Sequence, residues 1–234
     1  MKIFSVVFDY NQNDRYAKLE QTFRKSVEVN CPGTELTIAR IEAPKATKRK
    51  IGLTSNWHKF KRWVEFVDAQ QDGEHVILMD VDMLVLGDLR PAFRESFDIG
   101  ITRRTSANWP YNGGVVFVKV SNLTRGFIKR WGEIDEQMYR DERFHAPYSA
   151  KYKGQNQSSL GWMVEHDESC KIKEFPCAVW NACNEDWKAF GNHTKVLHLK
   201  STLRLVALGE QRGTPSKMRR AVNEFKKYER MVNA

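Results

Sequence analysis

The residues best suited to do chemistry are two aspartates that directly follow an apolar run. Residues 76–79 read Val-Ile-Leu-Met, and Asp80 and Asp82 come immediately after them. An unbroken apolar run predicts a strand buried on both faces, where an unpaired carboxylate is costly. Because carboxylate oxygens favour hard cations, we expect magnesium or manganese (Mg²⁺ or Mn²⁺) here, carrying the phosphate oxygens of a ligand. The alternative is that Asp80 and Asp82 only cap a turn.

A second segment places an amide side chain and two glycines before an apolar strand. From residue 111 the sequence reads Tyr-Asn-Gly-Gly, followed by Val-Val-Phe-Val. Glycines allow the backbone to approach a ligand closely, and an asparagine offers both a hydrogen-bond donor and an acceptor. We expect Asn112, Gly113 and Gly114 to contact a ligand. A plain turn that leads into the strand is the alternative.

A third segment carries an imidazole followed by cationic side chains. His198 lies near the end of the apolar stretch 195–199, and Lys200 and Arg204 come shortly after it. The imidazole is a candidate for a third metal ligand, and the two cations are candidates to neutralise a diphosphate. The alternative is a surface histidine that binds no ligand.

These segments belong to a chain in which strand-like and helix-like stretches alternate. The alternation predicts an α/β domain with a mainly parallel sheet, in which ligands bind at the carboxyl ends of the strands. The expected strands cover residues 3–8, 36–41, 76–79, 97–101, 115–120, 172–175 and 195–199. The expected helices cover 14–29, 122–139, 158–164, a stretch that begins at Thr54 or Ser55, and a last one from Thr214. Residues 141–155 show little periodicity, and we expect a loop there.

Length and charge limit the class of protein. The 234 residues, 41% of them hydrophobic, suffice for one compact domain with a sizeable core. The net charge of +9 is concentrated in residues 40–62 and 214–234, which indicates a polyanionic partner or an anionic substrate. No apolar run reaches the roughly 18 residues that cross a bilayer, and no cleavage site follows the short apolar start of the chain. We therefore expect a cytoplasmic protein without a membrane span.

The three segments together resemble the retaining branch of the GT-A glycosyltransferases, the glycosyltransferase family 8-like group that contains glycogenin and bacterial galactosyltransferases. Asp80-Val81-Asp82 resembles the DxD metal motif of that group, and residues 111–115 are similar to its Asn-(Ala/Ser)-Gly-Val segment. The resemblance implies a GT-A-like (Rossmann-like) three-layer sandwich with a mainly parallel central sheet over residues 1–205, the nucleotide-sugar-binding and catalytic domain. Residues 206–234 would form a basic amphipathic helix packed on the same domain.

The resemblance also implies roles for single residues. The metal ligands would be Asp80, Asp82 and His198. The residues expected to bind the nucleotide sugar are Asp9, Tyr10, Lys59, Asp80, Asn112, Gly113, Gly114, Lys200 and Arg204. Asn156 and Gln157 are similar to the Asp-Gln helix start beside the reacting sugar carbon, and they are the expected catalytic residues. Asn156 stands where most relatives have aspartate, which removes an obvious carboxylate base or nucleophile, and the family's His-x-x-Gly pattern after the last strand is absent.

The implied function is metal-dependent transfer of a sugar, with retention, from a nucleotide sugar to an acceptor hydroxyl, and a UDP-sugar is the favoured donor. The basic segments make modified DNA or another nucleic acid the first candidate acceptor, with Trp57, Trp109 and Tyr111 as stacking surfaces. A glycan, lipopolysaccharide or protein acceptor is the alternative.

Two other classes of protein stay open. A sugar-nucleotide nucleotidyltransferase should carry a Gly-rich loop after its first strand, where this chain has residues 8–12. A non-catalytic nucleic-acid-binding protein would leave Asp80 and Asp82 without a purpose.

Overall fold

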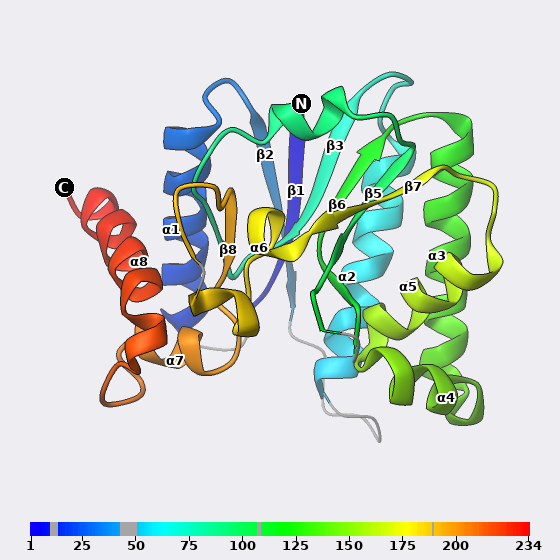
Figure 1. Ribbon diagram of the computed structural model, residues 1–234. Coiled ribbons are helices and arrows are strands. Elements are labelled where there is room, and N and C mark those ends of the chain that lie inside the picture. The colour runs from blue at the N-terminus through cyan, green and yellow to red at the C-terminus, as the bar shows by residue number, and fades with distance from the viewer. Residues whose placement is uncertain (10–13, 43–50, 107–108, 189) are drawn as a thin grey trace.

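The computed structural model describes residues 1–9, 14–42, 51–106, 109–188 and 190–234. At its centre is a six-stranded sheet (Figure 1). In spatial order the strands are β2 (Glu35–Glu42), β1 (Lys2–Asp9), β3 (His75–Asp80), β6 (Tyr111–Lys119), β5 (Ile99–Arg103) and β7 (Ile172–Pro176). Among these described strands, β6 alone runs antiparallel to its neighbours. The expected α/β class with a mainly parallel sheet is confirmed.

Helices cover both faces of the sheet and complete three layers (Figure 1). One face carries α1 (Asp14–Asn30), with α8 (Arg219–Val232) packed against it, and the other carries α2 (Ile51–Asp68), α3 (Asn122–Arg140) and α5 (Gln155–His166). Side chains alternate along β1, so that Ile3 and Val7 pack in the core beside α1, whereas Phe4 and Val6 pack in the core beside α2 and α3. None of the described helices is both long and apolar enough to cross a membrane.

A second, smaller sheet pairs two segments that are far apart in the sequence. β4 (Met83–Val85) follows directly after the two aspartates, and it pairs antiparallel with β8 (Val196–His198). The shorter helical elements are η1 (Arg90–Arg94), α4 (Glu142–Tyr152), α6 (Cys177–Trp180), η2 (Asn184–Lys188), α7 (Thr202–Ala207) and η3 (Ser216–Met218). The pairing of β4 with β8 brings the histidine segment beside the aspartate segment.

The reversed strand β6 bulges near one of its ends. Ile101 of β5 pairs with Val116, but the next residue, Thr102, pairs with Asn112. Residues 113–115 therefore have no partner on β5, and the strand bulges there. Because β6 runs antiparallel to β3, this bulge lies beside the carboxyl end of β3, where Asp80 stands. The bulge turns Gly113 and Gly114 out of the regular hydrogen-bonding pattern between β5 and β6.

The loop expected at residues 141–155 is instead mostly helix. α4 begins after Asp141, whose carboxylate accepts hydrogen bonds from two backbone N–H groups of the first turn. Pro147 lies inside the helix, and the sequence shows no regular apolar stripe because few of its side chains are buried. The expectation of a loop was wrong because it rested on the apolar pattern alone.

A buried polar network attaches α5 to α3. α5 begins at Gln155, three residues earlier than expected, so that Asn156 and Gln157 lie in its first turn. Gln155 Nε2 donates to the backbone oxygen of Asp135 at 2.6 Å, and Ser159 Oγ donates to Asp135 Oδ1 at 2.7 Å. The Asp135 side chain is fully buried on α3. This network thus holds the first turn of α5 in place.

The stability of the protein should fall as this aspartate ionises. Burial raises the pKa of Asp135 to about 7, in spite of the hydrogen bond from Ser159, whereas the unfolded chain ionises an aspartate near pH 4. Between about pH 4 and pH 7 the folded state therefore binds more protons, and the free energy of unfolding falls with rising pH, by up to about 4 kcal/mol in total. We expect D135N to lack this part of the pH dependence. Urea unfolding of the wild type and of D135N at several pH values between about 4 and 7 measures this dependence. An equal fall of the free energy of unfolding in D135N would contradict the prediction.

Candidate active site

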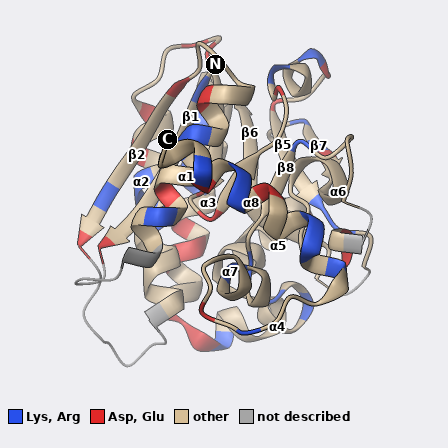
Figure 2. Ribbon diagram, turned by 90° about the vertical axis from the view of Figure 1, so that its left-hand side faces the viewer, with Lys and Arg blue, Asp and Glu red and all other residues tan. Residues whose placement is uncertain are grey.

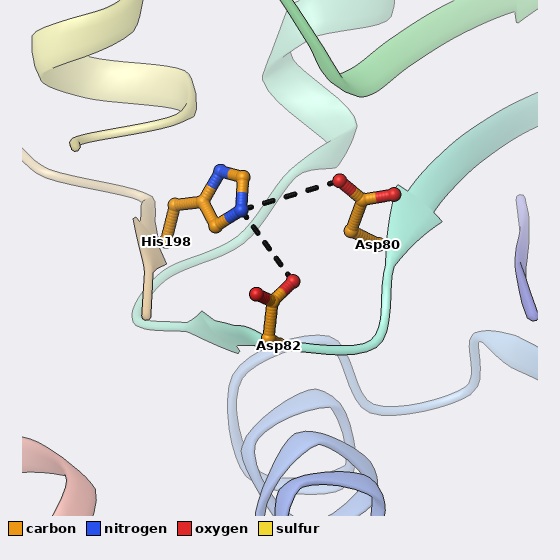
Figure 3. A group of neighbouring side chains, drawn as sticks. All are labelled: Asp80, Asp82 and His198. Atoms are coloured by element: carbon orange, nitrogen blue, oxygen red, sulfur yellow. Dashed lines mark ion pairs between the residues drawn. The ribbon is translucent and has the colours of Figure 1, made fainter. Parts of the chain in front are cut away.

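Two aspartates and a histidine meet at the carboxyl edge of the sheet (Figure 3). Asp80 is the last residue of β3, Asp82 lies in the turn before β4, and His198 ends β8, where it pairs with Met83. His198 Nε2 lies 3.4 Å from Asp82 Oδ1 and 4.0 Å from Asp80 Oδ2. One ligand atom from each residue lies within 4.8 Å of the others. This set of two carboxylates and one imidazole fits a divalent cation such as Mn²⁺ or Mg²⁺.

The amide of Asn181 orients the imidazole of His198. Asn181 Nδ2 donates to Thr102 Oγ1 at 2.8 Å and to the backbone oxygen of Asn112 at 3.3 Å. Because a backbone oxygen can only accept, these contacts fix the amide with its Oδ1 toward His198 Nδ1, at 3.0 Å. Nδ1 therefore donates to Asn181 Oδ1, and Nε2 faces the space between the carboxylates, where it is placed to bind a metal ion.

We expect N181A to bind Mn²⁺ roughly 10- to 100-fold more weakly than the wild type, because His198 then loses the partner that holds its tautomer and ring orientation. Calorimetric titration of the purified protein with Mn²⁺ measures the change. T102V is the matched control, since it removes another partner of the same amide and leaves the contact with His198. Its affinity should stay close to that of the wild type, and an unchanged affinity in N181A would contradict the prediction.

Cations already contact the two carboxylates. Lys59 Nζ donates to Asp80 Oδ1 at 2.6 Å, and Arg204 Nη1 donates to Asp82 Oδ2 at 3.1 Å. Burial opposes ionisation of Asp82, but His198, Arg204 and Lys200 outweigh it and lower the pKa of Asp82 to about 2. The Asp82 carboxylate is therefore ionised at neutral pH, as a metal ligand must be.

A cavity of about 250 Å³ is lined by these residues. Its lining includes every site residue expected from the sequence except Asp9 and Tyr10. The lining residues are Asn56, Lys59, Asp80, Asp82, Asn112, Gly113, Gly114, Asn156, Gln157, His198, Lys200, Ser201 and Arg204. Asp9 ends β1 outside this lining, and its half-exposed carboxylate accepts a hydrogen bond from Arg40 Nη1 at 3.0 Å. Tyr10 lies outside the described residues.

The two glycines of the β6 bulge have different surroundings. A Cβ atom on Gly114 would lie 2.9 Å from His198 Cε1 and 3.0 Å from Asp80 Oδ2. A Cβ atom on Gly113 would meet nothing closer than Asn156 Cβ, at 3.8 Å. Only a glycine at position 114 therefore leaves room for the aspartate and the imidazole to approach each other, whereas position 113 has space for a small side chain.

The two asparagines of the cavity also differ. Asn112 Oδ1 accepts a hydrogen bond from Gly114 N at 3.1 Å, and its Nδ2 donates to Cys183 Sγ at 3.3 Å, so its amide holds the bulge. Neither amide atom of Asn156 has a hydrogen-bond partner among the described residues, although the side chain is buried. Buried amides are nearly always hydrogen-bonded. The Asn156 amide is therefore left for polar groups of a ligand in the cavity.

Three residues of the site were not expected from the sequence: Asn56, Asn181 and Ser201. Asn56 precedes Lys59 by three residues on α2, so helical periodicity could have placed both on one face. Asn181 follows α6 in a segment without periodicity, and its contact with His198 depends on the tertiary fold. Ser201 adopts a left-handed backbone conformation (φ 51°) between β8 and α7, which no sequence pattern for serine predicts.

The features expected to bind a nucleic acid do not lie together. Trp57 stacks on Tyr139 with ring centroids 4.7 Å apart and lines a groove between α2 and α3, whereas Trp109 and Tyr111 line a different cavity. The basic side chains of α8 are exposed on the outer side of the layer that contains α1 (Figure 2). The basic residues 45–50 lie outside the described part of the chain.

Comparison of the sequence alone yields no match, either to a protein-family model or to a curated protein. Solved structures do match. The galactosyltransferase LgtC, in complex with donor and acceptor sugar analogues, has a TM-score of 0.58 and 12% identity over 100% of this chain and 97% of its own. The apo form of the glycosyltransferase GlyE from Streptococcus pneumoniae TIGR4 has a TM-score of 0.63 and 13% identity over 99% of this chain, which spans 62% of GlyE.

A third similar structure is a glycosyltransferase involved in the glycosylation of the major capsid of PBCV-1, with a TM-score of 0.59 and 12% identity over 86% of this chain and 94% of that one. At identities this low, the similarity is one of fold. The chain therefore has the GT-A fold of glycosyltransferases, with the DxD-type aspartates at the carboxyl edge of the sheet. The expected GT-A-like sandwich is confirmed.

Proposed function

We propose that the protein is a metal-dependent glycosyltransferase that transfers a sugar from a nucleotide sugar, with UDP-sugars as the first candidates, to an acceptor hydroxyl. The observation that carries this proposal is the meeting of Asp80, Asp82 and His198 in a cavity at the carboxyl edge of the sheet. Ligands of open α/β sheets bind at this edge. The GT-A fold supports the same class, because the similar structures described above are glycosyltransferases.

Positive charge in the cavity stabilises the nucleoside diphosphate that leaves the donor. A divalent cation held by the two aspartates and His198 supplies charge that stabilises the departing nucleoside diphosphate. Lys200 and Arg204 line the same cavity and add fixed positive charge from the protein itself. Lys59 holds Asp80 in position through the ion pair of 2.6 Å. These residues bind and stabilise a diphosphate without taking part in bond formation.

Polar groups on α5 are placed to bind the donor sugar. Asn156 and Gln157 line the cavity in the first turn of this helix, and the amide of Asn156 has both atoms available for the sugar hydroxyls. A Cβ atom on Gly113 would meet nothing closer than Asn156 Cβ, at 3.8 Å, so close packing does not obstruct a sugar on this side of Asn156. We place the reacting anomeric carbon beside these three residues.

The lack of a free base favours retention of configuration. Among the described residues that line the cavity, the only carboxylates are Asp80 and Asp82, and both contact cations. Inversion requires a general base that deprotonates the acceptor. In the retaining reaction the acceptor oxygen forms a bond to the anomeric carbon while the bond from that carbon to the diphosphate oxygen breaks. The electron pair of that bond and the acceptor proton both pass to the diphosphate.

For the acceptor we propose a sugar hydroxyl, as in a glycan. The separate positions of Trp57, Trp109 and the basic face of α8 give no support to a nucleic-acid acceptor. A lipopolysaccharide or a protein-linked glycan would present the same hydroxyl chemistry to the cavity.

Thermal shift with nucleotide sugars tests the proposal. We expect UDP-sugars to raise the Tm by several degrees in the presence of Mn²⁺ and much less without it, because a ligand that binds only the folded state stabilises it. The D80A variant should lose this shift, and its Tm without ligand shows whether it still folds. Release of UDP from the same sugar nucleotides then measures turnover. If UDP-, GDP- and CDP-sugars all fail to shift the Tm with Mn²⁺, or if D80A responds like the wild type, the proposal is wrong.

A further inference from the structure

A second cavity adjoins the first. Its volume is about 320 Å³, and it shares Asn56, Gln157, Lys200 and Ser201 with the cavity that contains the metal ligands. The remaining lining comes from Arg104, Trp109, Tyr111, Tyr152, Lys153, Gly154 and Asn184. Because Gln157 belongs to both linings, a molecule in the second cavity would reach the place where the donor sugar is proposed to react.

The backbone of this second cavity is strained. Among the described residues, four that are not glycine have a positive φ: Trp109 (58°), Lys153 (55°), Asn184 (27°) and Ser201 (51°). All four line this one cavity. Such conformations cost of order 1–3 kcal/mol each and cluster at binding and catalytic sites. Their concentration around one cavity is typical of a ligand-binding site.

The charged side chains of the lining are all cationic. They are Arg104, Lys153 and Lys200, and the described lining contains no aspartate or glutamate. The Arg104 side chain is only 11% exposed, and its Nε has no hydrogen-bond partner in the described part of the chain. The nearest carboxylate, that of Glu185, lies 3.8 Å from this Nε.

Nearby acids outside the lining have partners of their own. Glu174 accepts hydrogen bonds from Tyr111 Oη at 3.0 Å and from Arg103 Nη1, and Glu165 accepts from Tyr152 Oη and Lys151 Nζ. These contacts satisfy the hydroxyls of Tyr111 and Tyr152. The described lining therefore holds three cations and no acid, with Glu185 at 3.8 Å as the partner of Arg104 and with Lys200 bordering Asp80 and Asp82 in the first cavity.

An aromatic wall completes the cavity. The Trp109 side chain is 37% exposed, and Lys153 Nζ lies 3.9 Å from the centroid of its ring. Tyr111 and Tyr152 stack with centroids 5.6 Å apart and an interplanar angle of 12°. Aromatic rings offer a flat apolar surface, which fits the apolar C–H face of a pyranose ring. Lys153 Nζ, which lies above the Trp109 ring, is placed to bind an acidic group carried by a sugar against that ring.

We propose that this second cavity binds the acceptor and that the acceptor is an acidic sugar, with a carboxylate or phosphate group held by Arg104 and Lys153. The inference rests on the proposed glycosyltransferase function and names its acceptor class. The ring of the acceptor lies against Trp109, and one of its hydroxyls points toward Gln157 and the donor sugar. In the transfer that hydroxyl oxygen bonds to the anomeric carbon, and its proton leaves with the diphosphate.

Binding of matched neutral and acidic sugars tests this directly, without a donor and without turnover. The pairs are methyl glucoside with methyl glucuronide, methyl galactoside with methyl galacturonide, and glucose with glucose 6-phosphate. We expect at least one acidic member to bind at least tenfold more tightly than its neutral partner, and the carboxylate and phosphate pairs distinguish the two sources of charge. In R104Q the ratio of the affinity for the acidic sugar to the affinity for its neutral partner should fall below about threefold, because one charge-assisted hydrogen bond is lost.

R103Q is the matched control, because Arg103 precedes Arg104 in the chain, carries the same charge and pairs with Glu174 outside the lining. The ratio of acidic to neutral sugar affinity in R103Q should equal the ratio in the wild type. Equal binding of every acidic and neutral pair, an unchanged ratio in R104Q, or tighter binding of a short single-stranded oligonucleotide than of any acidic sugar would overturn the inference. The thermal shift with nucleotide sugars tests the glycosyltransferase proposal, and the affinity ratios test the acceptor inference. The failure of one can therefore be told from the failure of the other.

Discussion

Replacing Asp82 with asparagine should lower kcat/KM for donor turnover about a thousandfold or more, since charge stabilisation of a leaving group by a metal or by fixed donors contributes on this scale. The amide has nearly the same shape as the carboxylate, so packing around the turn is preserved. It carries no charge, however, and cannot bind a divalent cation as a carboxylate does. It also leaves the guanidinium of Arg204, now 3.1 Å from Asp82 Oδ2, without its counter-ion.

The matched control is D88N, the same replacement at an exposed aspartate that pairs with Arg90 on the surface. Turnover by D88N should equal that of the wild type. UDP release with Mn²⁺ over a range of donor concentrations gives kcat/KM, and the Tm of each variant separates lost chemistry from lost folding. A D82N protein that folds and retains more than about a tenth of the wild-type activity would remove Asp82 from the proposed mechanism, given the magnitudes expected for such groups.

Placing a methyl group on Gly114 should have the second largest effect. In G114A the new Cβ would lie 2.7 Å from Met83 Cε, 2.9 Å from His198 Cε1 and 3.0 Å from Asp80 Oδ2. The imidazole and the carboxylate must then move apart. Since displacements of metal ligands well below 1 Å impair a preorganised site, we expect Mn²⁺ affinity to fall by about tenfold or more and donor turnover by about 100-fold.

The neighbouring glycine provides the control. A Cβ on Gly113 meets nothing closer than 3.8 Å, so G113A should bind Mn²⁺ with the affinity of the wild type. The comparison uses metal affinity because Gly113 also borders the space assigned to the donor sugar. If the two alanine variants bind Mn²⁺ equally well, then the close packing at Gly114 is not what holds the metal ligands in place.

The metal-ligand cluster was the part of the site most accessible from the sequence. Asp80 and Asp82 stand out because burial of a whole strand forces any acid at its end to find a cation, and this physical constraint acts within one short segment. His198 was predictable only as a candidate. Its contact with the aspartates depends on the pairing of β4 with β8, two strands of three residues each that are far too short to be recognised by periodicity.

Other parts of the site depend on tertiary contacts that leave no local pattern. Asn181 orients His198 through a single hydrogen bond across the fold. The bulge in β6 results from how that strand pairs on its two sides, and the sequence showed only a pair of glycines. α4 was missed because it is largely exposed, so its sequence carries little of the apolar spacing on which helix prediction relies. The family resemblance predicts Asp9 at the nucleotide, but it says nothing of the direction of its carboxylate, which lies 3.0 Å from Arg40 Nη1.

The four non-glycine residues with positive φ share one further property, which bears on the acceptor inferred above. Each lies in a connection or at its border: Trp109 between β5 and β6, Lys153 between α4 and α5, Asn184 at the start of η2, and Ser201 between β8 and α7. The metal ligands, by contrast, stand at or next to the ends of paired strands. Connections tolerate substitution and changes of length far better than paired strands do. Mutational libraries confined to the connections that hold Trp109, Lys153 and Asn184 should therefore yield folded proteins with altered acceptor choice and an intact donor site. The connection between β8 and α7 is left unchanged in them, because Lys200 and Ser201 also line the cavity of the metal ligands.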